Sequence, residues 1–354
     1  MKKGITKAVV VVTGVDLGDK ASQVCALSAG GERLFEKKVQ TSEKGLRGVF
    51  GKLEGCRVVM EAGGQSGWIS RLLREMGHEV KVVNPRKMRR IYENESKSDV
   101  VDARELADAG LYRWDKLPVV YLRDRVSQEK LSVLRSRDAL VRARTGLVNL
   151  VRSLLKQEGV RVSKGTTEAF AKKALPLVPE GLAVAVNPLL GQIAVLTGEI
   201  RQLDKWIARA GEKEPEVKAL QQIGGVGAVT AAAYVWTIGE PSRFAKSRAV
   251  GSFLGMRPRR DQSGETDKQL PITKAGNPFL RRLLVGCAHY ILGPHGPDTA
   301  LRRWGLKLAE RGGKRAKRKA VVAVARKLAV LLHHLWVTGE VYEPFPEVAG
   351  QRAA

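Results

Sequence analysis

Short apolar runs separated by turn residues dominate the first hundred positions of the chain. The runs at residues 8–15, 57–61 and 79–83 are rich in Val and Met and predict buried strands. Residues 23–27 and 32–39, with Gly30 and Gly31 between them, predict a hairpin. Helical spacing follows at residues 41–53, with Thr41 or Ser42 as the cap, and at residues 66–76 and 98–112. This order predicts an α/β domain whose first hairpin is antiparallel.

Four carboxylates stand at informative places in this pattern. Asp16 and Glu61 each end an expected strand, and open α/β sheets place their chemistry beyond the carboxyl ends of strands. Asp99 and Asp102 are three residues apart on the expected helix and so share one face. Carboxylate oxygens of this kind bind hard divalent cations such as Mg²⁺. The alternative is that these carboxylates have structural roles. Asp16 is then a turn residue, Glu61 is a helix cap, and Asp99 and Asp102 form a solvated acidic first turn.

A basic segment comes directly before the Asp pair, and it contains Arg86, Lys87, Arg89 and Arg90. These cations are placed to hold phosphates near the carboxylates. A solvated basic face is the alternative interpretation.

Pro118 marks a boundary, and from Val126 onward the middle of the chain has a purely helical pattern. One expected helix repeats apolar residues every seven positions, at Val126, Val133, Leu140, Leu147 and Leu154. A second alternates steps of four and three, at Leu189, Ile193, Leu196, Ile200, Leu203 and Ile207. Heptads predict coiled-coil packing, either within a hairpin or against a second protomer. Residues 164–180, between them, are poorly patterned.

The last third combines glycine motifs with basic clusters. Gly224-Gly225-Val226-Gly227 before a small-residue helix predicts a helix-hairpin-helix turn that admits a phosphate, or a plain tight turn. Residues 244–254 look helical, and residues 255–268 predict a polar loop that holds Ser263. Asn277 then caps a helix with Pro278 in its first position. Candidate nucleic-acid contacts are Arg257, Arg259, Arg260, Lys268, Lys274, Arg281 and Arg282.

Positive charge is densest between residues 302 and 327, which contain eleven Lys or Arg and one acid. The cluster Lys314, Arg315, Lys317, Arg318 and Lys319 leads into an apolar helix expected at residues 320–336, and residues after Pro344 look like a loose tail. A contact with a phosphate backbone explains the cluster, and a solvated helix face is the alternative. We therefore expect four regions: residues 1–118, 119–215, 216–340 and a tail at 341–354.

Composition narrows the class of protein. The chain has 354 residues, 44% of them hydrophobic, and a formal net charge of +26, which attracts polyanions, with nucleic acid the first candidate and an anionic membrane surface the second. No uninterrupted run of about 18 apolar residues occurs, so we expect no membrane span. The three cysteines fit neither a disulfide framework nor a zinc pattern, which favours a reducing cytoplasm.

The four carboxylates, the Lys97-to-Ala103 motif, the Gly-Gly-Val-Gly turn and the Gln-Ser-Gly loop before Lys274-Ala-Gly-Asn-Pro occur in one order. From about residue 8 to 338 the chain resembles the DEDD transposases of the insertion-sequence family numbered one hundred and ten, the bridge-RNA-guided recombinases. The carboxylate set is shared with other RuvC-like nucleases, whereas the C-terminal motifs are specific to this family.

The resemblance implies a fold, a site and partners. It implies an N-terminal RuvC-like (RNase H-like) domain, central coiled-coil helices, and a mostly helical C-terminal transposase domain. It implies Asp16, Glu61, Asp99 and Asp102 as ligands of Mg²⁺, with Mn²⁺ as an alternative, and Ser263 as the nucleophile. It also implies donor and target DNA, a structured noncoding guide RNA, a tetramer built as a dimer of dimers with shared active sites, and work at the bacterial nucleoid in the cytoplasm, with no membrane partner.

Two other functions remain open at this point. A metal-dependent junction nuclease would cut by attack of water and need no serine. A nucleic-acid-binding scaffold would need neither the serine nor the carboxylates. A tyrosine recombinase fits less well, because no Arg, His and Tyr constellation surrounds Tyr290 or Tyr342.

Overall fold

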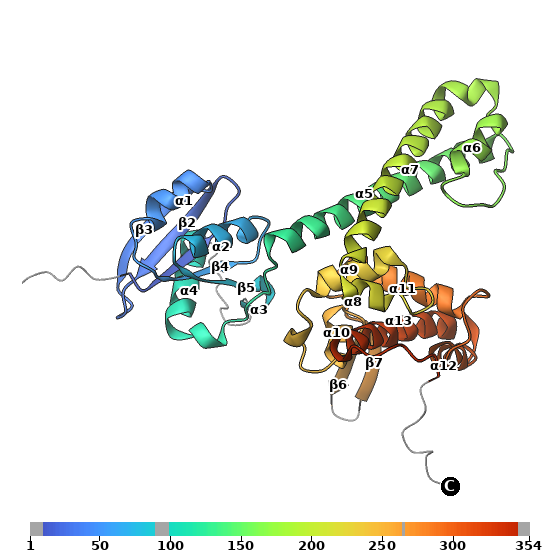
Figure 1. Ribbon diagram of the computed structural model, residues 1–354. Helices are drawn as coiled ribbons and strands as arrows, with labels where there is room; N and C mark the ends of the chain where they lie inside the picture. Colours follow the sequence, from blue (N-terminus) through green and yellow to red (C-terminus); the bar gives the residue numbers. More distant parts are fainter. Residues whose placement is uncertain (1–9, 89–98, 264–265, 346–354) are drawn as a thin grey trace, which may run out of the picture. The chain divides into compact units, whose positions relative to one another are not determined.

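The computed structural model describes residues 10–88, 99–263 and 266–345 (Figure 1). The chain divides into two compact units, Met1–Asp124 and Arg125–Ala354. The first is a mixed α/β unit with one sheet, and the second is mostly helical.

The sheet of the first unit contains the five strands that the sequence predicts. They run in the order β3-β2-β1-β4-β5. β1, β2 and β3 pair antiparallel, whereas β1, β4 and β5 pair parallel. The first strand begins at Val12 and not at the expected residue 8. Residues 10 and 11 are not part of it, and residues 8 and 9 lie outside the described part. The strands are β1 Val12–Asp16, β2 Ala21–Leu27, β3 Arg33–Gln40, β4 Arg57–Glu61 and β5 Glu79–Val83.

Helices cover both faces of this sheet. On one face α1 (Glu43–Phe50) and α2 (Ser66–Glu75) pack on the side chains of Val15, Val58 and Met60. On the other face α4 (Asp99–Tyr112) lies over β1, β2 and β4. The cap of α1 is Ser42, whose side chain accepts a hydrogen bond from the Gly45 N–H. The short helices α3 (Pro85–Met88) and η1 (Trp114–Lys116) flank α4 in sequence.

The backbone of α4 touches the sheet at two glycines. A Cβ added at Gly14 would lie 2.0 Å from the Ala103 carbonyl oxygen and 2.4 Å from the Ala107 nitrogen. A Cβ added at Gly110 would lie 2.7 Å from side-chain atoms of both Val12 and Val59. The order of these contacts means that α4 runs antiparallel to β1, so its N-terminal turn lies toward the carboxyl ends of β1 and β4.

This contact predicts the effect of two single substitutions in the first unit. Gly14→Ala should destabilise the unit by about 3 kcal/mol or more, because the new methyl group meets rigid helix backbone. Gly48→Ala, an exposed position inside α1 with nothing within 4 Å of the added carbon, should stabilise it by about 0.5–1 kcal/mol. Hydrogen–deuterium exchange of β1 and α4 in the full-length protein measures both effects. Equal protection of the Gly14→Ala and wild-type proteins would contradict the packing described.

The second unit begins with two long helices that lie side by side, α5 (Arg125–Gln157) and α7 (Ala183–Glu212) (Figure 1). They pair within one chain, and the connection between them holds α6 Phe170–Ala174, η2 Leu175–Leu177 and η3 Glu180–Leu182.

The buried seam of this hairpin agrees only in part with the expected heptads. On α7, Ile193, Ile200 and Ile207 are buried as expected. On α5 the buried residues, such as Leu134, Val148 and Leu155, come one position after the expected series, whose Val126 is 58% exposed. The expected series on α5 therefore flanks the most buried positions, and its Val133, Leu147 and Leu154 are partly buried against the core.

The remaining helices form the body of the second unit around a single apolar core. Its centre is α9, whose Tyr234 is fully buried and donates a hydrogen bond to the Ala329 carbonyl of α13 over 2.6 Å. The elements are α8 Pro215–Leu220, α9 Ala228–Ile238, η4 Pro241–Arg243, α10 Arg248–Phe253, α11 Pro278–Leu292, α12 Ala300–Ala309 and α13 Gly313–Thr338.

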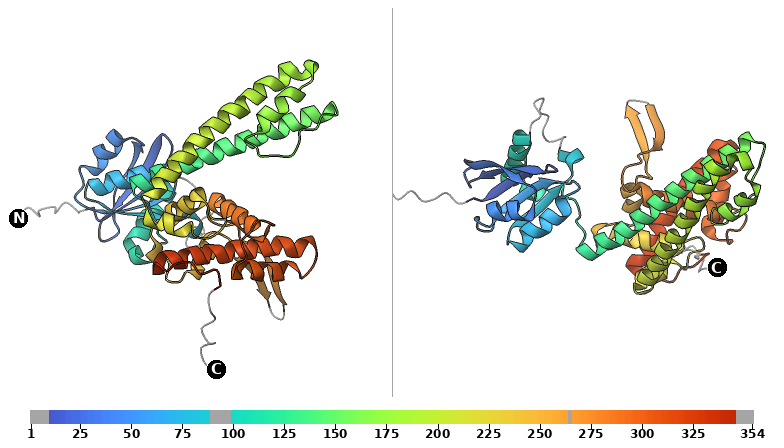
Figure 2. Two further views of the ribbon diagram at one scale, coloured as in Figure 1. Left: turned by 45° about the vertical axis from the view of Figure 1, so that its right-hand side comes forward. Right: turned by 90° about the horizontal axis from the view of Figure 1, so that it is seen from above.

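Two sequence predictions in this unit need correction. The expected polar loop at residues 255–268 is largely a two-stranded hairpin, β6 (Pro258–Ser263) and β7 (Thr266–Ile272), which projects from the helical body (Figure 2). Its exposed strands lack the apolar alternation by which sequence reasoning finds a strand. The last long helix begins at Gly313, so the basic cluster forms its first turns instead of preceding it. The cap by Asn277, which accepts from the Phe279 and Leu280 N–H groups, is confirmed.

Two stretches, Glu180–Glu212 and Gly313–Thr338, are long and apolar enough to cross a membrane by length and composition alone. In this protein α7 packs on α5 and α13 packs in the core of the second unit, and helices of a protein core share that composition. Cys25, Cys56 and Cys287 are buried and free, as expected of cysteines that form no disulfide, and burial raises the pKa of Cys25 and Cys56 to about 11.

Candidate functional site

The four predicted carboxylates come from three segments of the first unit. Asp16 is the last residue of β1 and Glu61 the last of β4, and these two strands are parallel neighbours. The register pairs Val15 with Met60, so Asp16 and Glu61 stand one residue further along the same edge. Both are half-buried. The sheet therefore places two carboxylates next to each other at its edge.

The Asp pair lies at the start of α4, at the same end of the sheet. Asp102 precedes Ala103, whose carbonyl lies against Gly14, two residues before Asp16. Asp99 is the first residue of α4, and its side chain lies outside the described part of the structure. Among the described residues, no three His, Cys, Asp or Glu side chains are grouped closely enough to hold a metal ion. The backbone brings these positions to one edge, while the described side chains do not converge there.

The loops next to this edge are tied together by Gln65, which sequence reasoning missed. Its side-chain amide donates to the carbonyl oxygens of Asp19 at 3.0 Å and Gly18 at 3.4 Å. Thr41 also donates to the Gly18 carbonyl, at 3.0 Å. The segment after Asp16 is therefore fixed to the segment after Glu61. A glutamine in a Gly-rich turn carries no signal that would have indicated this role.

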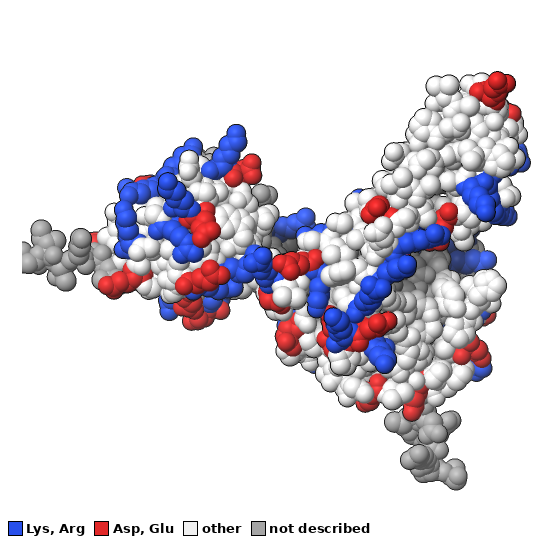
Figure 3. Space-filling view, turned by 45° about the horizontal axis from the view of Figure 1, so that its top comes forward, with Lys and Arg blue, Asp and Glu red and all other residues white. Residues whose placement is uncertain are grey.

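Of the basic residues predicted beside the Asp pair, Arg86 and Lys87 are exposed on α3. Arg89 and Arg90 lie outside the described residues. On the face drawn in Figure 3, Lys and Arg side chains lie over both units with Asp and Glu interspersed among them. The net charge is thus not gathered in one patch on that face.

Ser263, the predicted nucleophile, belongs to the second unit. It is the exposed last residue of β6 and pairs in register with Thr266. Near it, Arg260 makes a two-pronged ion pair with Asp267 across the hairpin, with N–O distances of 2.7 and 2.5 Å. This ion pair lowers the pKa of Asp267 and helps to fix the register of the hairpin. The serine is therefore carried by a hairpin arm whose strands are paired and cross-linked by this ion pair.

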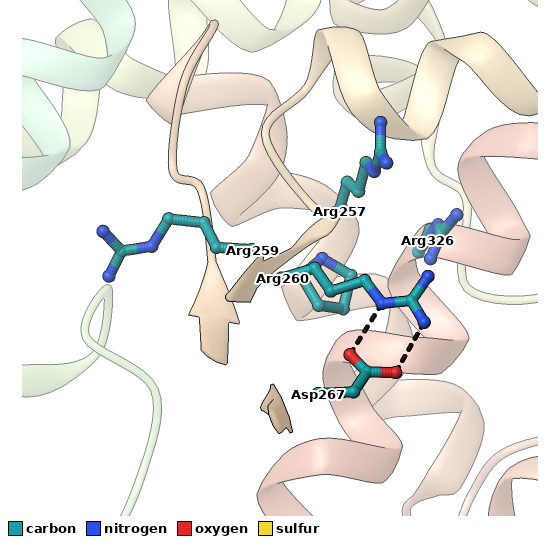
Figure 4. A pocket seen from close by; sticks show the side chains of 6 residues that line it. Arg257, Arg259, Arg260, Asp267 and Arg326 are labelled. Atoms are coloured by element: carbon teal, nitrogen blue, oxygen red, sulfur yellow. Dashed lines mark hydrogen bonds and ion pairs between the residues drawn. The ribbon is translucent and has the colours of Figure 1, made fainter. Parts of the chain in front are cut away.

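An arginine-rich pocket of about 520 Å³ lies at the base of this arm (Figure 4). Arg257 and Arg260 line it together with Arg326, which belongs to α13. Arg259 is also part of the lining, but its side chain extends away from the other three. Asp267 is the one carboxylate among its lining residues. The pocket therefore carries excess positive charge, which suits an anionic group such as a phosphate. Arg326 was not among the predicted contacts, since it lies far along the chain from the loop.

Close backbone contacts explain two glycines, one before and one after the hairpin. A Cβ at Gly255 would lie 1.9 Å from the Ala275 carbonyl oxygen, and a Cβ at Gly276 would lie 2.0 Å from that of Phe253. Both glycines have positive φ, of 68° and 83°. The Arg281 guanidinium donates to the Leu254 and Ala275 carbonyls across this junction, at 2.8 and 3.1 Å. Arg281, predicted to bind nucleic acid, thus holds together the two ends of the hairpin.

The other predicted cations of the second unit are in varied settings. Arg282 pairs with Asp138 of α5, which links α11 to the long helical hairpin. Lys268 and Lys274 are exposed, as are all five cations of the cluster on α13. The glycine turn at residues 224–227 leads into α9 and lines a shallow hollow of about 580 Å³ together with Arg282. These residues are accessible to a polyanion, apart from the paired Arg282.

Comparisons with known proteins show similarity to transposases along most of this chain. A family model for DEDD transposases, described as "Transposase", matches residues 13–159, and a model described as "Transposase IS116/IS110/IS902 family" matches residues 217–303. The chain is 29% identical over 345 residues to the transposase for insertion sequence element IS1111A of Coxiella burnetii, covering 94% of this chain and 91% of that protein. It is 31% identical over 317 residues to the putative transposase y4rJ of Sinorhizobium fredii, covering 81% and 78%.

These matches define a transposase, an enzyme that cuts DNA and rejoins it. Transposases of the DEDD type generally depend on divalent metal ions. More narrowly, the chain belongs to the IS110/IS116/IS902 family of insertion-sequence transposases.

The junction at the base of the hairpin is open to a direct test. Gly276→Ala should increase hydrogen exchange across β6 and β7, because the added methyl group meets the Phe253 carbonyl in a backbone conformation that alanine disfavours. Gly286→Ala, inside α11 with nothing within 4 Å of the added carbon, is the control and should leave the hairpin protected. Unchanged exchange in Gly276→Ala would show that the junction is not held by this contact.

Proposed function

We propose that this transposase cuts and rejoins DNA with a serine nucleophile and a divalent-metal site. Asp16, Glu61, Asp99 and Asp102 of a RuvC-like first unit hold the metal, and Ser263 attacks the phosphodiester. The observation that carries the proposal is the position of α4, whose first turn lies toward the strand ends that carry Asp16 and Glu61. Carboxylate oxygens are the ligands that Mg²⁺ and Mn²⁺ prefer.

The chain's residues divide the chemistry between the two units. Bound divalent metal would supply electrostatic stabilisation of the charge that develops on the phosphate oxygens. Ser263 Oγ forms a bond to phosphorus, the bond from phosphorus to the leaving sugar oxygen breaks, and that oxygen takes up a proton from water. The serine loses its own proton to a base brought to it in the assembly, for which the carboxylates of the first unit are the candidates. Arg257, Arg260 and Arg326 hold the phosphate or its neighbour.

A phosphoserine link retains a phosphate ester at the cut strand, so a hydroxyl of another strand can displace the serine and rejoin the DNA. A nuclease that uses water would instead release the cut strand, so the phosphoserine link distinguishes the two mechanisms. The exposed position of Ser263 on a projecting arm suits attack on a large substrate. The two sets of residues stand in separate units, so we propose that they meet in an assembly in which protomers share active sites.

The partners follow from charge and from the family. We propose donor and target DNA as substrates and a structured noncoding RNA as the guide that pairs with both. The exposed cations Arg86, Lys87, Arg259, Lys268, Lys274 and the cluster on α13 would contact the phosphate backbones. The protein would act as a homo-oligomer, a tetramer built as a dimer of dimers, at the nucleoid in the cytoplasm.

The metal site predicts a selective loss of Mn²⁺ binding. Asp102→Asn should weaken binding of Mn²⁺ to the full-length protein by about tenfold or more. Loss of a residue that only hydrogen-bonds to a metal ligand already lowers metal affinity by about that factor, and Asp102 is itself a proposed ligand. Asp115→Asn makes the same chemical change at an exposed position beyond the other end of α4 and should leave affinity unchanged. Electron paramagnetic resonance of free Mn²⁺ during titration measures both. Equal affinity in the two variants would remove Asp102 from the site.

The serine predicts a covalent protein–DNA adduct. Wild-type protein with labelled DNA, guide RNA and Mg²⁺ should give a shifted band on a denaturing gel, and Ser263→Ala and Asp102→Ala should each abolish it. Ser252→Ala, an exposed serine of α10, is the matched control and should keep the band. If protomers share sites, mixing the Ser263→Ala and Asp102→Ala proteins restores part of the adduct. An adduct that persists in Ser263→Ala would assign the nucleophile to another residue.

A further inference from the structure

A third and larger hollow of the second unit lies between the β6–β7 hairpin and α13. This groove, which we call the hairpin groove, encloses about 1170 Å³. One face of α13 forms its floor, because its lining residues there recur at steps of three and four from Arg315 to Val330. Leu270, Pro271 and Ile272 of β7 form the opposite wall, and Trp304 of α12 also lines it.

The groove combines an apolar interior with a strongly basic rim. Leu270, which is 37% exposed, faces a helix surface that includes Val322, Ala323 and Val330. Seven of the lining residues are Lys or Arg and none is acidic; α13 contributes Arg315, Arg318, Lys319, Arg326 and Lys327. Lys314 and Lys317, on the same helix, are not part of the lining. The basic cluster is therefore sorted by helical face, with part of it directed to this groove.

Within the part of the chain that the structure describes, these cations have no acidic partner. Among the described residues, none of the seven forms an ion pair, whereas other arginines of the unit do, such as Arg303 with Asp298 and Arg282 with Asp138. Lys327 lies 4.6 Å from the centre of the Trp304 ring, which places a cation over an aromatic surface inside the groove. Seven like charges around one hollow repel one another until an anionic ligand neutralises them. The ligand has to be both anionic and able to fill an apolar interior.

An unpaired nucleic-acid strand meets both requirements. A duplex presents its phosphates, its sugars and the edges of its bases, but the flat faces of the bases are stacked inside and cannot contact an apolar interior. A single strand offers bases to aromatic and aliphatic side chains while its phosphates contact Lys and Arg. The groove also shares Pro258 and Arg326 with the arginine-rich pocket at the base of the arm that carries Ser263. This continuity favours the strand on which that arm acts, which is DNA.

We propose that the hairpin groove binds an unpaired segment of the DNA strand next to the phosphodiester that is cut. Bases enter between Leu270 and the apolar face of α13, and Trp304, with the Lys327 ammonium over its ring, borders the same space. The phosphates follow the row of cations on α13 toward the arginine-rich pocket. The choice of DNA rests on the proposed function, since it depends on Ser263 acting on that strand. The preference for an unpaired strand rests on the groove itself.

The test measures binding without cleavage. Ser263→Ala protein in EDTA is titrated into labelled single-stranded DNA of about 12 nucleotides, a length within the usual range of single-strand sites. The same sequence as duplex DNA and as single-stranded RNA gives the comparison. Single-stranded DNA should bind at least about fivefold more tightly than the duplex. Because no cleavage is needed, failure of the serine chemistry would leave this result unaffected, and the covalent adduct is scored separately.

Variants in that background locate the site. Leu270→Ser should weaken single-strand binding by about fivefold or more through loss of contact with a base, and its exposed position keeps the fold intact. Arg318→Ala with Lys319→Ala should lower the slope of log affinity against log salt concentration by about 1.4, as expected for two lost contacts to a single strand. Lys307→Ala with Arg311→Ala removes the same charges outside the groove and should leave the slope unchanged.

Three results would overturn the proposal. Duplex binding as tight as single-strand binding would make the groove an ordinary phosphate contact. Tighter binding of the RNA strand, with the same losses in the groove variants, would make it an RNA site and refute the assignment to DNA. Unchanged affinity in both the Leu270→Ser and the Arg318→Ala/Lys319→Ala proteins would place the bound strand elsewhere on the chain.

Discussion

Gly14 has no side chain, and the carbonyl of Ala103 stands where its Cβ would be. This contact between a strand and the backbone of a helix sets the height and direction of α4 on the sheet. Gly110 repeats it against Val12 and Val59, so that the helix lies antiparallel to β1 over two further turns. The first turn of α4 is thereby aimed at the strand ends that carry Asp16 and Glu61. The proposed metal site thus depends on two glycines that never touch it.

The arm that carries Ser263 is also positioned by glycines that allow close backbone contact, here in the helical second unit. Gly255 and Gly276 let the chain that enters the hairpin lie directly against the chain that leaves it. Arg281 then bridges the carbonyls on the two sides, and the ion pair between Arg260 and Asp267 holds the strands in register further out. A stretch that the sequence predicts to be a polar loop is therefore held at its base by close backbone contacts and by the Arg281 hydrogen bonds. An exposed serine on such an arm can be presented to a large substrate without a pocket of its own.

The sequence predicted well wherever burial imposes a period on the chain. The five strands of the first unit, the cap at Asn277 and the buried series Ile193, Ile200 and Ile207 all follow from apolar spacing and local capping chemistry. The hairpin at residues 258–272 could not be found this way, because both of its faces are polar or exposed over much of their length. The most buried series on α5 was not singled out, because spacing alone does not say which of two adjacent apolar series faces α7. Gln65 and Arg326 were missed because their roles depend on contacts between distant segments.

Diffraction can show whether α4 completes a metal site at the carboxyl edge of the sheet. Crystals of the wild-type protein soaked in Mn²⁺ should show an anomalous difference peak bounded by the carboxylates of Asp16, Glu61 and Asp102. Their side chains would then have moved together from the arrangement described, in which no three are grouped. An ordered α4 with no Mn²⁺ at this edge, or Mn²⁺ bound only at other carboxylates of the chain, would mean that α4 does not complete a metal site.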